Sequence, residues 1–264
     1  MLSVEVEADA GAVAVAAAAR LTSVVEEAID RRGTAVISLT GGQTPRRLYS
    51  LLADASYPWR SRIDWQHLHV FWGDERHVPP DHRDSNFGMA FETLLRHVPI
   101  PPAAIHRMRG ELPDAGDAAR EYDAALRNGF AAAGRRTQTF DLMLLGLGED
   151  AHIASVFPGS SLLESPAPPP DAASVEPPPL AAAVWAAHLG AWRITLTPPA
   201  LLDADAILMV VAGESKADAM QAALEGPDDV VRWPAQLLRR ADGRVRWIAD
   251  RPAAAHLRRI AGGH

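Results

Sequence analysis

Hydrophobic residues occur in two alternating patterns along the chain. Apolar residues that recur every three or four positions indicate amphipathic helices, whereas short unbroken apolar runs indicate strands buried on both faces. The first pattern predicts helices over residues 9–31, 46–53, 85–97, 117–130 and 214–226, and a final helix after residue 250. The second pattern predicts strands over residues 34–40, 67–74, 140–148, 181–188, 193–197, 203–213 and 244–250.

The alternation of strands with helices is typical of a parallel sheet covered by helices on both faces. The length of 264 residues fits one large domain. We therefore expect a single α/β domain over residues 1–264, doubly wound and Rossmann-like, with a mostly parallel central sheet. The proline-rich segment at about residues 158–180 interrupts the pattern and is expected to be an irregular surface loop.

Composition narrows the classes of function. The net charge of −7 argues against a nucleic-acid-binding protein, because such proteins usually carry a basic face. The chain has no cysteine, which excludes disulfides, thiolate metal ligands and cysteine nucleophiles. No apolar run reaches the ~18 residues of a membrane span. We expect no membrane association and a cytoplasmic location.

Four polar clusters follow predicted strands. In a parallel α/β sheet, ligands bind beyond the carboxyl ends of the strands, so these clusters are expected to meet at one edge. They are Gly41–Pro45, Gly73–His77, Gly146–His152 and Gly213–Lys216.

The first cluster, Gly-Gly-Gln-Thr-Pro, connects a strand to a helix. Glycines let backbone amides approach a ligand, and a helix N-terminus attracts anions. The Thr44 hydroxyl and the nearby Arg46 add a donor and a positive charge. The spacing of a Walker phosphate loop is absent. Phosphate binding and a plain strand-to-helix turn are equally compatible with these residues.

The second cluster places Asp74, Glu75, Arg76 and His77 at the end of a strand. Charged groups in this position either face a binding cleft or form a solvated salt bridge. If the cluster faces a cleft, an acid or Arg76 would point into it.

The third cluster contains Gly146 to Ala151, which formally matches the dinucleotide fingerprint G-x-G-x-x-A. That fingerprint requires a full helix and then a second strand that ends in an acid about 20 residues later. Pro158 and Gly159 interrupt any such helix, and the proline-rich segment follows. Nicotinamide or flavin binding is therefore not expected.

His152 lies in the same cluster and is a candidate general base. A single histidine is more often structural than catalytic, but Asp150 lies two residues earlier, where it can orient an imidazole. Histidine titrates near neutral pH, which suits proton transfer. No G-x-S-x-G elbow surrounds Ser155, so a Ser-His-Asp triad is not expected. His67 and His69 lack a third ligand, so no metal site is predicted.

Lys216, in the fourth cluster, falls in the first turn of a predicted helix. A lysine is unfavourable at this end of the helix dipole unless an anion binds there. An anion-binding lysine and a solvated lysine are equally compatible with the residues.

Together, four stretches resemble the 6-phosphogluconolactonases, in the superfamily that also contains glucosamine-6-phosphate deaminases. They read LTGGQTP, VFWGDERHVPPDHRDSN, LLGLGEDAHIASVFPGS, and RITLTPPAL with VVAGESKADAM, and they fall in order within about residues 33–226. The resemblance implies hydrolysis of 6-phospho-D-glucono-1,5-lactone to 6-phospho-D-gluconate in the oxidative pentose phosphate pathway. It implies neither a metal nor an organic cofactor.

The resemblance also assigns roles by position. His152 would be the general base, Asp150 its polar neighbour, and Arg76 would face the substrate. The phosphate would be bound by Gly41, Gly42, Thr44 and Lys216. Further candidate contacts are Asp74, Arg46, Gly148 and Arg193. The expected partner is a small sugar-phosphate lactone, with no nucleic acid and no membrane, and the protein is expected to be a monomer or a small homo-oligomer.

The chain departs from the family pattern beside His152. The family reads Asp-Gly-His-Thr-Ala-Ser, whereas this chain reads Asp-Ala-His-Ile-Ala-Ser. Ala151 places a Cβ where a positive φ would strain the backbone. The deaminases carry a functional glutamate at the position of Phe157, so hydrolysis is favoured. Two alternatives stay open, a sugar-phosphate isomerase or deaminase and a non-catalytic sugar-phosphate-binding regulator.

Overall fold

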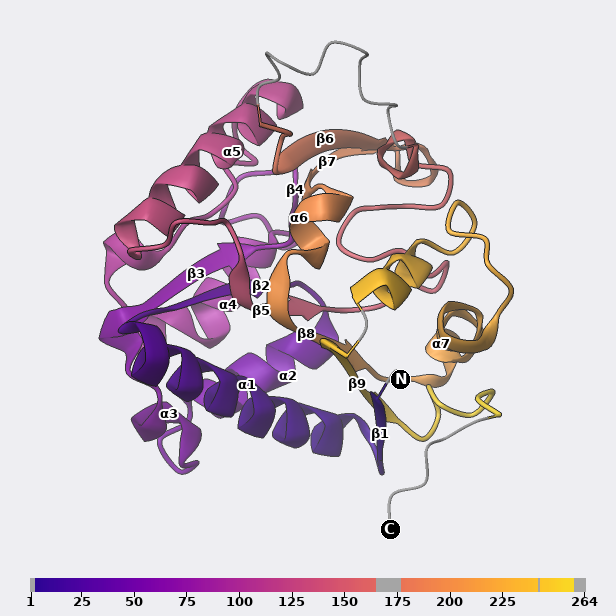
Figure 1. Ribbon diagram of the computed structural model, residues 1–264, viewed down its shortest axis with the longest axis horizontal. Helices are drawn as coiled ribbons and strands as arrows, with labels where there is room; N and C mark the ends of the chain where they lie inside the picture. Colours follow the sequence, from indigo (N-terminus) through magenta and orange to yellow (C-terminus); the bar gives the residue numbers. More distant parts are fainter. Residues whose placement is uncertain (1–2, 165–176, 242, 259–264) are drawn as a thin grey trace.

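A six-stranded parallel sheet forms the centre of the computed structural model, which describes residues 3–164, 177–241 and 243–258 (Figure 1). Its strand order is β1-β9-β8-β5-β2-β3, and every neighbouring pair is parallel. The strands are β1 Ser3–Glu7, β2 Ala35–Leu39, β3 Leu68–Trp72, β5 Phe140–Leu145, β8 Ala204–Val211 and β9 Val245–Asp250. All residues of β2 and β5 are buried, as expected for strands that are covered on both faces.

Helices cover both faces of this sheet, with α1 and α2 on one side and α5 and α6 on the other (Figure 1). The α-helices are α1 Ala10–Arg32, α2 Gln43–Ala53, α3 Trp59–Arg62, α4 Asn86–Thr93, α5 Ala115–Ala132, α6 Pro198–Leu202 and α7 Ala217–Glu225. Short 3₁₀ turns lie at Trp65–His67, Leu95–His97, Pro102–Ala104, Ser161–Leu163, Ala187–Leu189, Glu214–Lys216 and Pro234–Ala241. The predicted mostly parallel α/β architecture is confirmed.

A second, three-stranded antiparallel sheet was not predicted. It consists of β4 Asp74–Arg76, β7 Ala191–Leu196 and β6 Ala181–Ala186. The run 67–74 was predicted as one strand, but it divides at Gly73. The Gly73 amide donates to Leu39 of β2, and its carbonyl accepts from Leu196 of β7. The chain therefore leaves one sheet and enters the other at this residue, which aims β4 toward the carboxyl edge of the main sheet.

Several local predictions need correction. The helix predicted over residues 85–97 ends at Thr93 and is followed by a 3₁₀ turn. The C-terminal helix predicted after residue 250 is wrong for residues 251–258, which form turns, and residues 259–264 lie outside the described part of the chain. Most of the proline-rich segment, residues 165–176, also lies outside it. Within the described ranges, no helix is long and apolar enough to cross a membrane.

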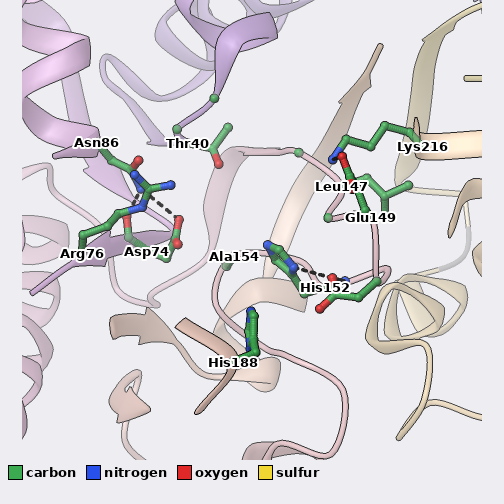
Figure 2. Close-up of a pocket in the computed structure, with 15 residues that line it drawn as sticks. Thr40, Asp74, Arg76, Asn86, Leu147, Glu149, His152, Ala154, His188 and Lys216 are labelled. Atoms are coloured by element: carbon green, nitrogen blue, oxygen red, sulfur yellow. Dashed lines mark hydrogen bonds and ion pairs between the residues drawn. The ribbon is translucent and has the colours of Figure 1, made fainter. Parts of the chain in front are cut away.

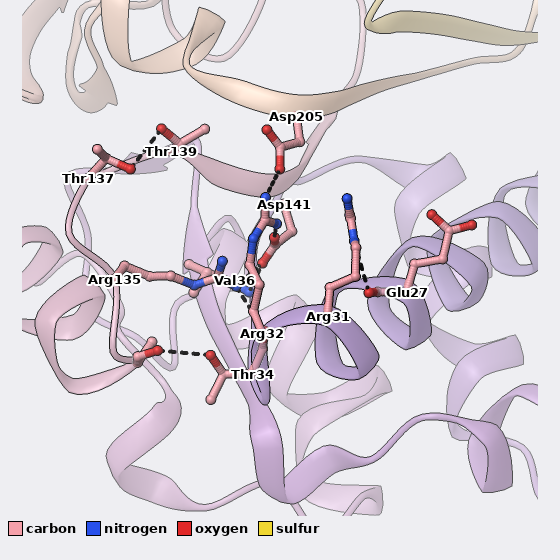
Figure 3. Close-up of polar contacts among 11 residues, drawn as sticks. Glu27, Arg31, Arg32, Thr34, Val36, Arg135, Thr137, Thr139, Asp141 and Asp205 are labelled. Atoms are coloured by element: carbon pink, nitrogen blue, oxygen red, sulfur yellow. Dashed lines mark hydrogen bonds and ion pairs between the residues drawn. The ribbon is translucent and has the colours of Figure 1, made fainter.

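A buried carboxylate, Asp141, ties the chain together near the amino end of β5 (Figure 3). Its side chain is 2% exposed, accepts the Val36 amide at 2.7 Å and pairs with Arg32 and Arg135. Arg32 also bonds Asp205 at 2.6 Å. Removing one partner of a buried ion pair typically costs about 3–5 kcal/mol, because the other charge is left uncompensated. This network fixes β2, β5 and the end of α1 relative to one another.

Candidate active site

The four polar clusters meet at the carboxyl edge of the main sheet, as their positions predict. They enclose a cavity of about 550 Å³. It is lined by Thr40, Gly41, Gly42, Asp74, Arg76, Asn86, Gly146, Leu147, Gly148, Glu149, Asp150, His152, Ala154, His188 and Lys216. Figure 2 shows Asp74, Arg76 and Asn86 on one side and Lys216 on the other, with His152 between them.

The loop after β5 holds His152 against Asp150. The Nδ1 atom of His152 lies 2.6 Å from Asp150 Oδ1, and the His152 amide donates to the same oxygen at 3.2 Å. Because a carboxylate can only accept, the proton of a neutral imidazole sits on Nδ1. Nε2 then carries a lone pair, which is the state required of a general base.

Asp150 is ionised at neutral pH. Partial burial opposes its ionisation, but the hydrogen bond and charge of His152 outweigh that cost and lower the pKa of Asp150 to about 2. A negative charge therefore orients the ring of His152.

The backbone of this loop is tightly turned. The Gly148 amide donates to the His152 carbonyl at 2.9 Å, and the Ala151 amide donates to the Gly148 carbonyl at 3.1 Å. Ala151 has a φ of 62°, and Ala154 a φ of 49°. Ala151 therefore has the positive φ at which a Cβ atom strains the backbone. Its methyl group is fully buried, so packing offsets part of the strain.

The turn between β2 and α2 presents backbone amides to the cavity. Gly42 is the N-cap of α2, and no side chain caps this helix. Gly41 and Gly42 both line the cavity. Free amides at a helix N-terminus form a suitable site for an anion.

Asp74 is held at the cavity wall by two neighbours. The Ser155 hydroxyl donates to Asp74 Oδ2 at 2.6 Å, and Asn86 Nδ2 donates to Asp74 Oδ1 at 3.2 Å and to its carbonyl at 2.9 Å. All three residues are at least nine-tenths buried. Ser155 thus serves Asp74 rather than His152, which agrees with the expected absence of a Ser-His-Asp triad.

Glu75 connects β4 to the start of α4. Its carboxylate accepts from the amides of Asn86 and Phe87 and from the Ser85 hydroxyl, at 2.7, 2.8 and 3.1 Å. Burial raises the pKa of Glu75, although its three backbone hydrogen bonds favour the charged form. This buried acid at the helix N-terminus fixes where Asn86 stands.

Arg76 supplies positive charge to the cavity. One of its terminal nitrogens donates to the Asp84 carbonyl at 2.5 Å, and its Nε is buried without a partner among the described residues. Arg193 is its register partner on β7. Burial, followed by the charge of Arg76, lowers the pKa of Arg193. Arg76 thus brings its charge to the cavity, and Arg193 lies beside it on β7.

Lys216 stands at the start of α7, at the end of a 3₁₀ turn. The Gly213 amide donates to both oxygens of the buried Asp250 at 3.0 Å, which anchors this turn. The nearest acid to the Lys216 ammonium group is Glu149, at 3.9 Å. Such a long ion pair is weak, so the lysine retains donors for a ligand in the cavity.

Three predicted contacts do not line the cavity, namely Thr44, Arg46 and Arg193. Arg46 lines a separate hollow with Phe87 and Phe91. Conversely, Thr40, Asn86, Ala154 and His188 line the cavity without having been predicted. Asn86 sits in a polar stretch at a predicted helix start, which is a usable signal. His188 follows an apolar strand, and nothing local marks it as a cavity residue.

His67 and His69, the two histidines considered as metal ligands, do not come together in a metal site. His67 is exposed and pairs with Asp64 at 2.7 Å. His69 stacks against His106, with 3.1 Å between Nδ1 of His69 and Nε2 of His106. Across residues 3–164, 177–241 and 243–258, no group of three or more His, Asp or Glu side chains is arranged to hold a metal ion.

Comparisons with known proteins identify relatives of this chain. The family model for glucosamine-6-phosphate isomerases/6-phosphogluconolactonase matches residues 8–247. A 6-phosphogluconolactonase of Mycobacterium tuberculosis is 36% identical over 270 residues, covering 97% of this chain and 98% of that protein. The solved 6-phosphogluconolactonase of Trypanosoma cruzi superposes with a TM-score of 0.80 at 25% identity, over 98% of each chain.

A solved monomeric glucosamine-6-phosphate deaminase shares the same fold. It superposes with a TM-score of 0.77 at 20% identity, over 97% of this chain and 100% of that chain. The fold alone therefore does not separate hydrolysis from deamination.

Proposed function

The chain belongs to the glucosamine-6-phosphate isomerase/6-phosphogluconolactonase family, and we propose that it hydrolyses 6-phospho-D-glucono-1,5-lactone to 6-phospho-D-gluconate. Among the activities of this family, one structural observation supports hydrolysis. Nδ1 of His152 is held 2.6 Å from ionised Asp150, in a cavity that also contains cationic side chains. A base, a water-accessible cavity and groups for an anionic substrate are what lactone hydrolysis requires.

Binding of the substrate rests on its phosphate. The amides at Gly41 and Gly42 and the ammonium group of Lys216 are the groups that we assign to it. With its phosphate anchored there, the lactone ring extends toward His152. Such positioning converts a collision into an intramolecular step and supplies a large part of the rate enhancement.

The chemical step uses His152 twice. Its Nε2 removes a proton from water as the water oxygen attacks the carbonyl carbon C1, giving a tetrahedral oxyanion. The bond between C1 and the ring oxygen then breaks, and the ring oxygen takes the proton back from Nε2. General-base catalysis of this kind contributes about 10²–10⁴-fold, and Asp150 stabilises the imidazolium that forms between the two transfers.

The oxyanion requires hydrogen-bond donors. The Gly148 amide is already bonded to the His152 carbonyl. The Arg76 guanidinium retains free donor capacity on the cavity wall. We therefore assign stabilisation of the oxyanion to Arg76.

Phe157 favours hydrolysis over the deaminase reaction. Its ring centroid lies 4.7 Å from that of His152. A phenyl ring cannot transfer the protons that ring opening of an amino sugar requires. The hydrogen bond between His152 and Asp150 also argues against a purely regulatory binding protein, which has no need of an oriented base.

The deciding experiment measures lactone hydrolysis by the purified chain against the spontaneous rate. We expect saturable turnover well above background, and no ammonia release from glucosamine 6-phosphate. A hydrolysis rate equal to background would exclude the proposal, and ammonia release would favour the deaminase. We further propose that the reaction occurs in the cytoplasm. The chain has no cysteine, so it forms no disulfide and does not depend on an oxidising compartment.

A further inference from the structure

We propose that Gln236 is a positioning residue for the reaction, because it holds the segment of residues 229–236 that fixes the loop of His152. The inference rests on the proposed function and concerns how the base keeps its place relative to the phosphate contacts. Gln236 does not line the cavity, so it acts through the backbone of this segment.

The loop of His152 contains two strained residues. Ala151 and Ala154 have φ values of 62° and 49°, in the left-handed region that a residue with a Cβ atom adopts only at a cost. Such a conformation persists only where surrounding contacts fix it. His152 lies between these two residues, so its position depends on contacts from outside the loop.

One segment, residues 229–236, contacts the loop on both sides of the base. The Ala235 amide donates to the Ala151 carbonyl at 2.9 Å. The Gly159 amide donates to the Val231 carbonyl at 2.8 Å. The two bonds bracket the base in the sequence, so a shift of the segment moves or releases the loop.

No other contact in the described part of the chain replaces the bond from Ala235. Ser155 anchors the far side of the loop, because its amide donates to the Thr195 hydroxyl at 3.2 Å and its hydroxyl donates to Asp74 at 2.6 Å. Among the described residues, only the Ala235 amide donates a hydrogen bond from outside the loop to residues 147–152. The part of the loop that carries the base therefore depends on this amide.

Gln236 holds the segment in its folded path. Its side-chain oxygen accepts the Asp229 amide at 2.8 Å, and its Nε2 donates to the carbonyls of Ala222 and Pro227, both at 2.9 Å. The residue is 5% exposed. Both donors and the acceptor of the side-chain amide are thus used, and the amide bridges the turn that leads from α7 to Ala235.

The same amide links the base to the phosphate contact. Ala222 belongs to α7, and Lys216 stands at the N-terminus of this helix. The turn before Lys216 is anchored separately by Asp250, so loss of the Gln236 amide should leave the phosphate contact in place. The position of His152 relative to an anchored lactone should change, and displacement of a catalytic group lowers turnover rather than binding.

The test compares Gln236→Leu with Arg244→Met. Leucine occupies a similar space but leaves the Asp229 amide and two carbonyls without their partner. Arg244 is the matched control, because its Nη1 also donates to two carbonyls, those of Leu202 and Ala204, at 3.0 and 2.6 Å. None of these control residues lines the cavity, so both variants should lose stability but only the first should disturb the base.

Steady-state kinetics give the first readout. In Gln236→Leu we expect kcat for 6-phosphogluconolactone to fall at least about tenfold with KM within about twofold, because the base is displaced and the phosphate contacts are not. In Arg244→Met both constants should stay within about twofold of the unaltered protein, at a temperature where each variant is folded. An unchanged kcat in Gln236→Leu, or an equal fall in the two variants, would overturn the positioning role.

Amide hydrogen exchange measures the hold on the loop directly. The amides of Gly148 and Ala151 make the hydrogen bonds that shape the loop, and they exchange when the loop opens. Their exchange should accelerate at least about tenfold more in Gln236→Leu than in Arg244→Met. Equal exchange rates in the two variants would contradict the proposal.

A milder variant applies if Gln236→Leu does not fold. Asp229→Ala removes a bond within the same segment, in which the exposed carboxylate accepts the Arg232 amide at 3.0 Å. It should lower kcat about threefold with KM unchanged, and speed exchange at Gly148. If kcat and the exchange rate both stay unchanged, the proposal is wrong.

Failure of the proposed function is a separate outcome. If the unaltered protein does not hydrolyse the lactone above background, the proposed function fails. The exchange comparison does not require turnover, so it still decides whether Gln236 holds the loop of His152.

Discussion

Gly148 lies directly against His152. A Cβ atom on Gly148 would come within 2.1 Å of His152 Nδ1 and within 2.6 Å of Asp150 Oδ1. Real Cβ contacts are never this short, so the hydrogen bond between the two side chains exists only because residue 148 has no side chain. Gly148 therefore leaves the space in which His152 and Asp150 meet.

Gly148→Ala should lower kcat about a hundredfold, because displacing a catalytic group by about 1 Å costs that much. Gly146→Ala is the matched control, since a Cβ there meets nothing within 4 Å. Steady-state kinetics of both variants check this. Similar kcat values in the two would show that the tight approach of Gly148 does not matter for catalysis.

His152→Ala should lower kcat at least about 100-fold without unfolding the chain, because it removes the base. Asp150→Asn should lower kcat by at least about tenfold. An asparagine amide can donate to Nδ1, which would force the proton onto Nε2 and leave no base. Initial rates and circular dichroism check both variants, with the exposed His67→Ala as a control. Near-normal turnover in His152→Ala would remove the base assignment.

Lys216→Ala should mainly raise KM, by about ten- to a hundredfold, as expected for loss of a charge-assisted contact to phosphate. Lys216→Arg should retain much of the affinity. Removing the competing acid with Glu149→Gln should leave KM unchanged or lower it slightly. The measurement is KM for the phosphorylated lactone. An unchanged KM in Lys216→Ala would mean that this lysine is merely solvated.

Ala151→Gly should change the free energy of unfolding by less than about 1 kcal/mol. Relief of the positive φ gains about 1–2 kcal/mol. The greater freedom of glycine in the unfolded chain costs about 0.4–1 kcal/mol, and loss of a buried methyl costs about 0.8 kcal/mol. Urea denaturation measures the net change. A gain above about 2 kcal/mol would show that the methyl does not compensate for the strain.

The stability of the protein should fall as the pH drops from about 6.5 to about 4. Burial, and then the charge of His69, lower the pKa of His106 to about 4, whereas an unfolded histidine titrates near 6.5. In this window the unfolded chain binds the extra proton, so stability decreases by about 2–3 kcal/mol and then levels off.

His106→Phe should lose most of this pH dependence. A phenyl ring preserves the stack on Phe71, whose centroid lies 4.3 Å away, but it does not titrate. Urea denaturation at pH 7.5 and pH 4.5 gives the comparison. An equal loss of stability in the variant and the unaltered protein would assign the effect to other groups.

Local pattern alone was enough to predict most elements and the approximate place of the site. β2 and β5 are uncharged or nearly uncharged apolar runs, and buried strands of a parallel sheet have that composition. The polar clusters follow the strands, and the carboxyl ends of parallel strands share one edge. The sequence also predicted that Asp150 and His152 would lie close together, because they are two residues apart in one loop.

The tertiary structure determined the features that depend on contacts between residues distant in the sequence. Periodicity reports that a strand is buried but not which strand lies beside it, so the division at Gly73 into two sheets was not predictable. Asn86 faces the cavity only because Glu75, eleven residues earlier, holds its amide. Thr44 and Arg46 are close to Gly42 in sequence, yet they do not line the cavity, because the helical path of α2 carries them away from it. The sequence determined which chemical groups stand near the strand ends, and long-range packing determined which of them face one another.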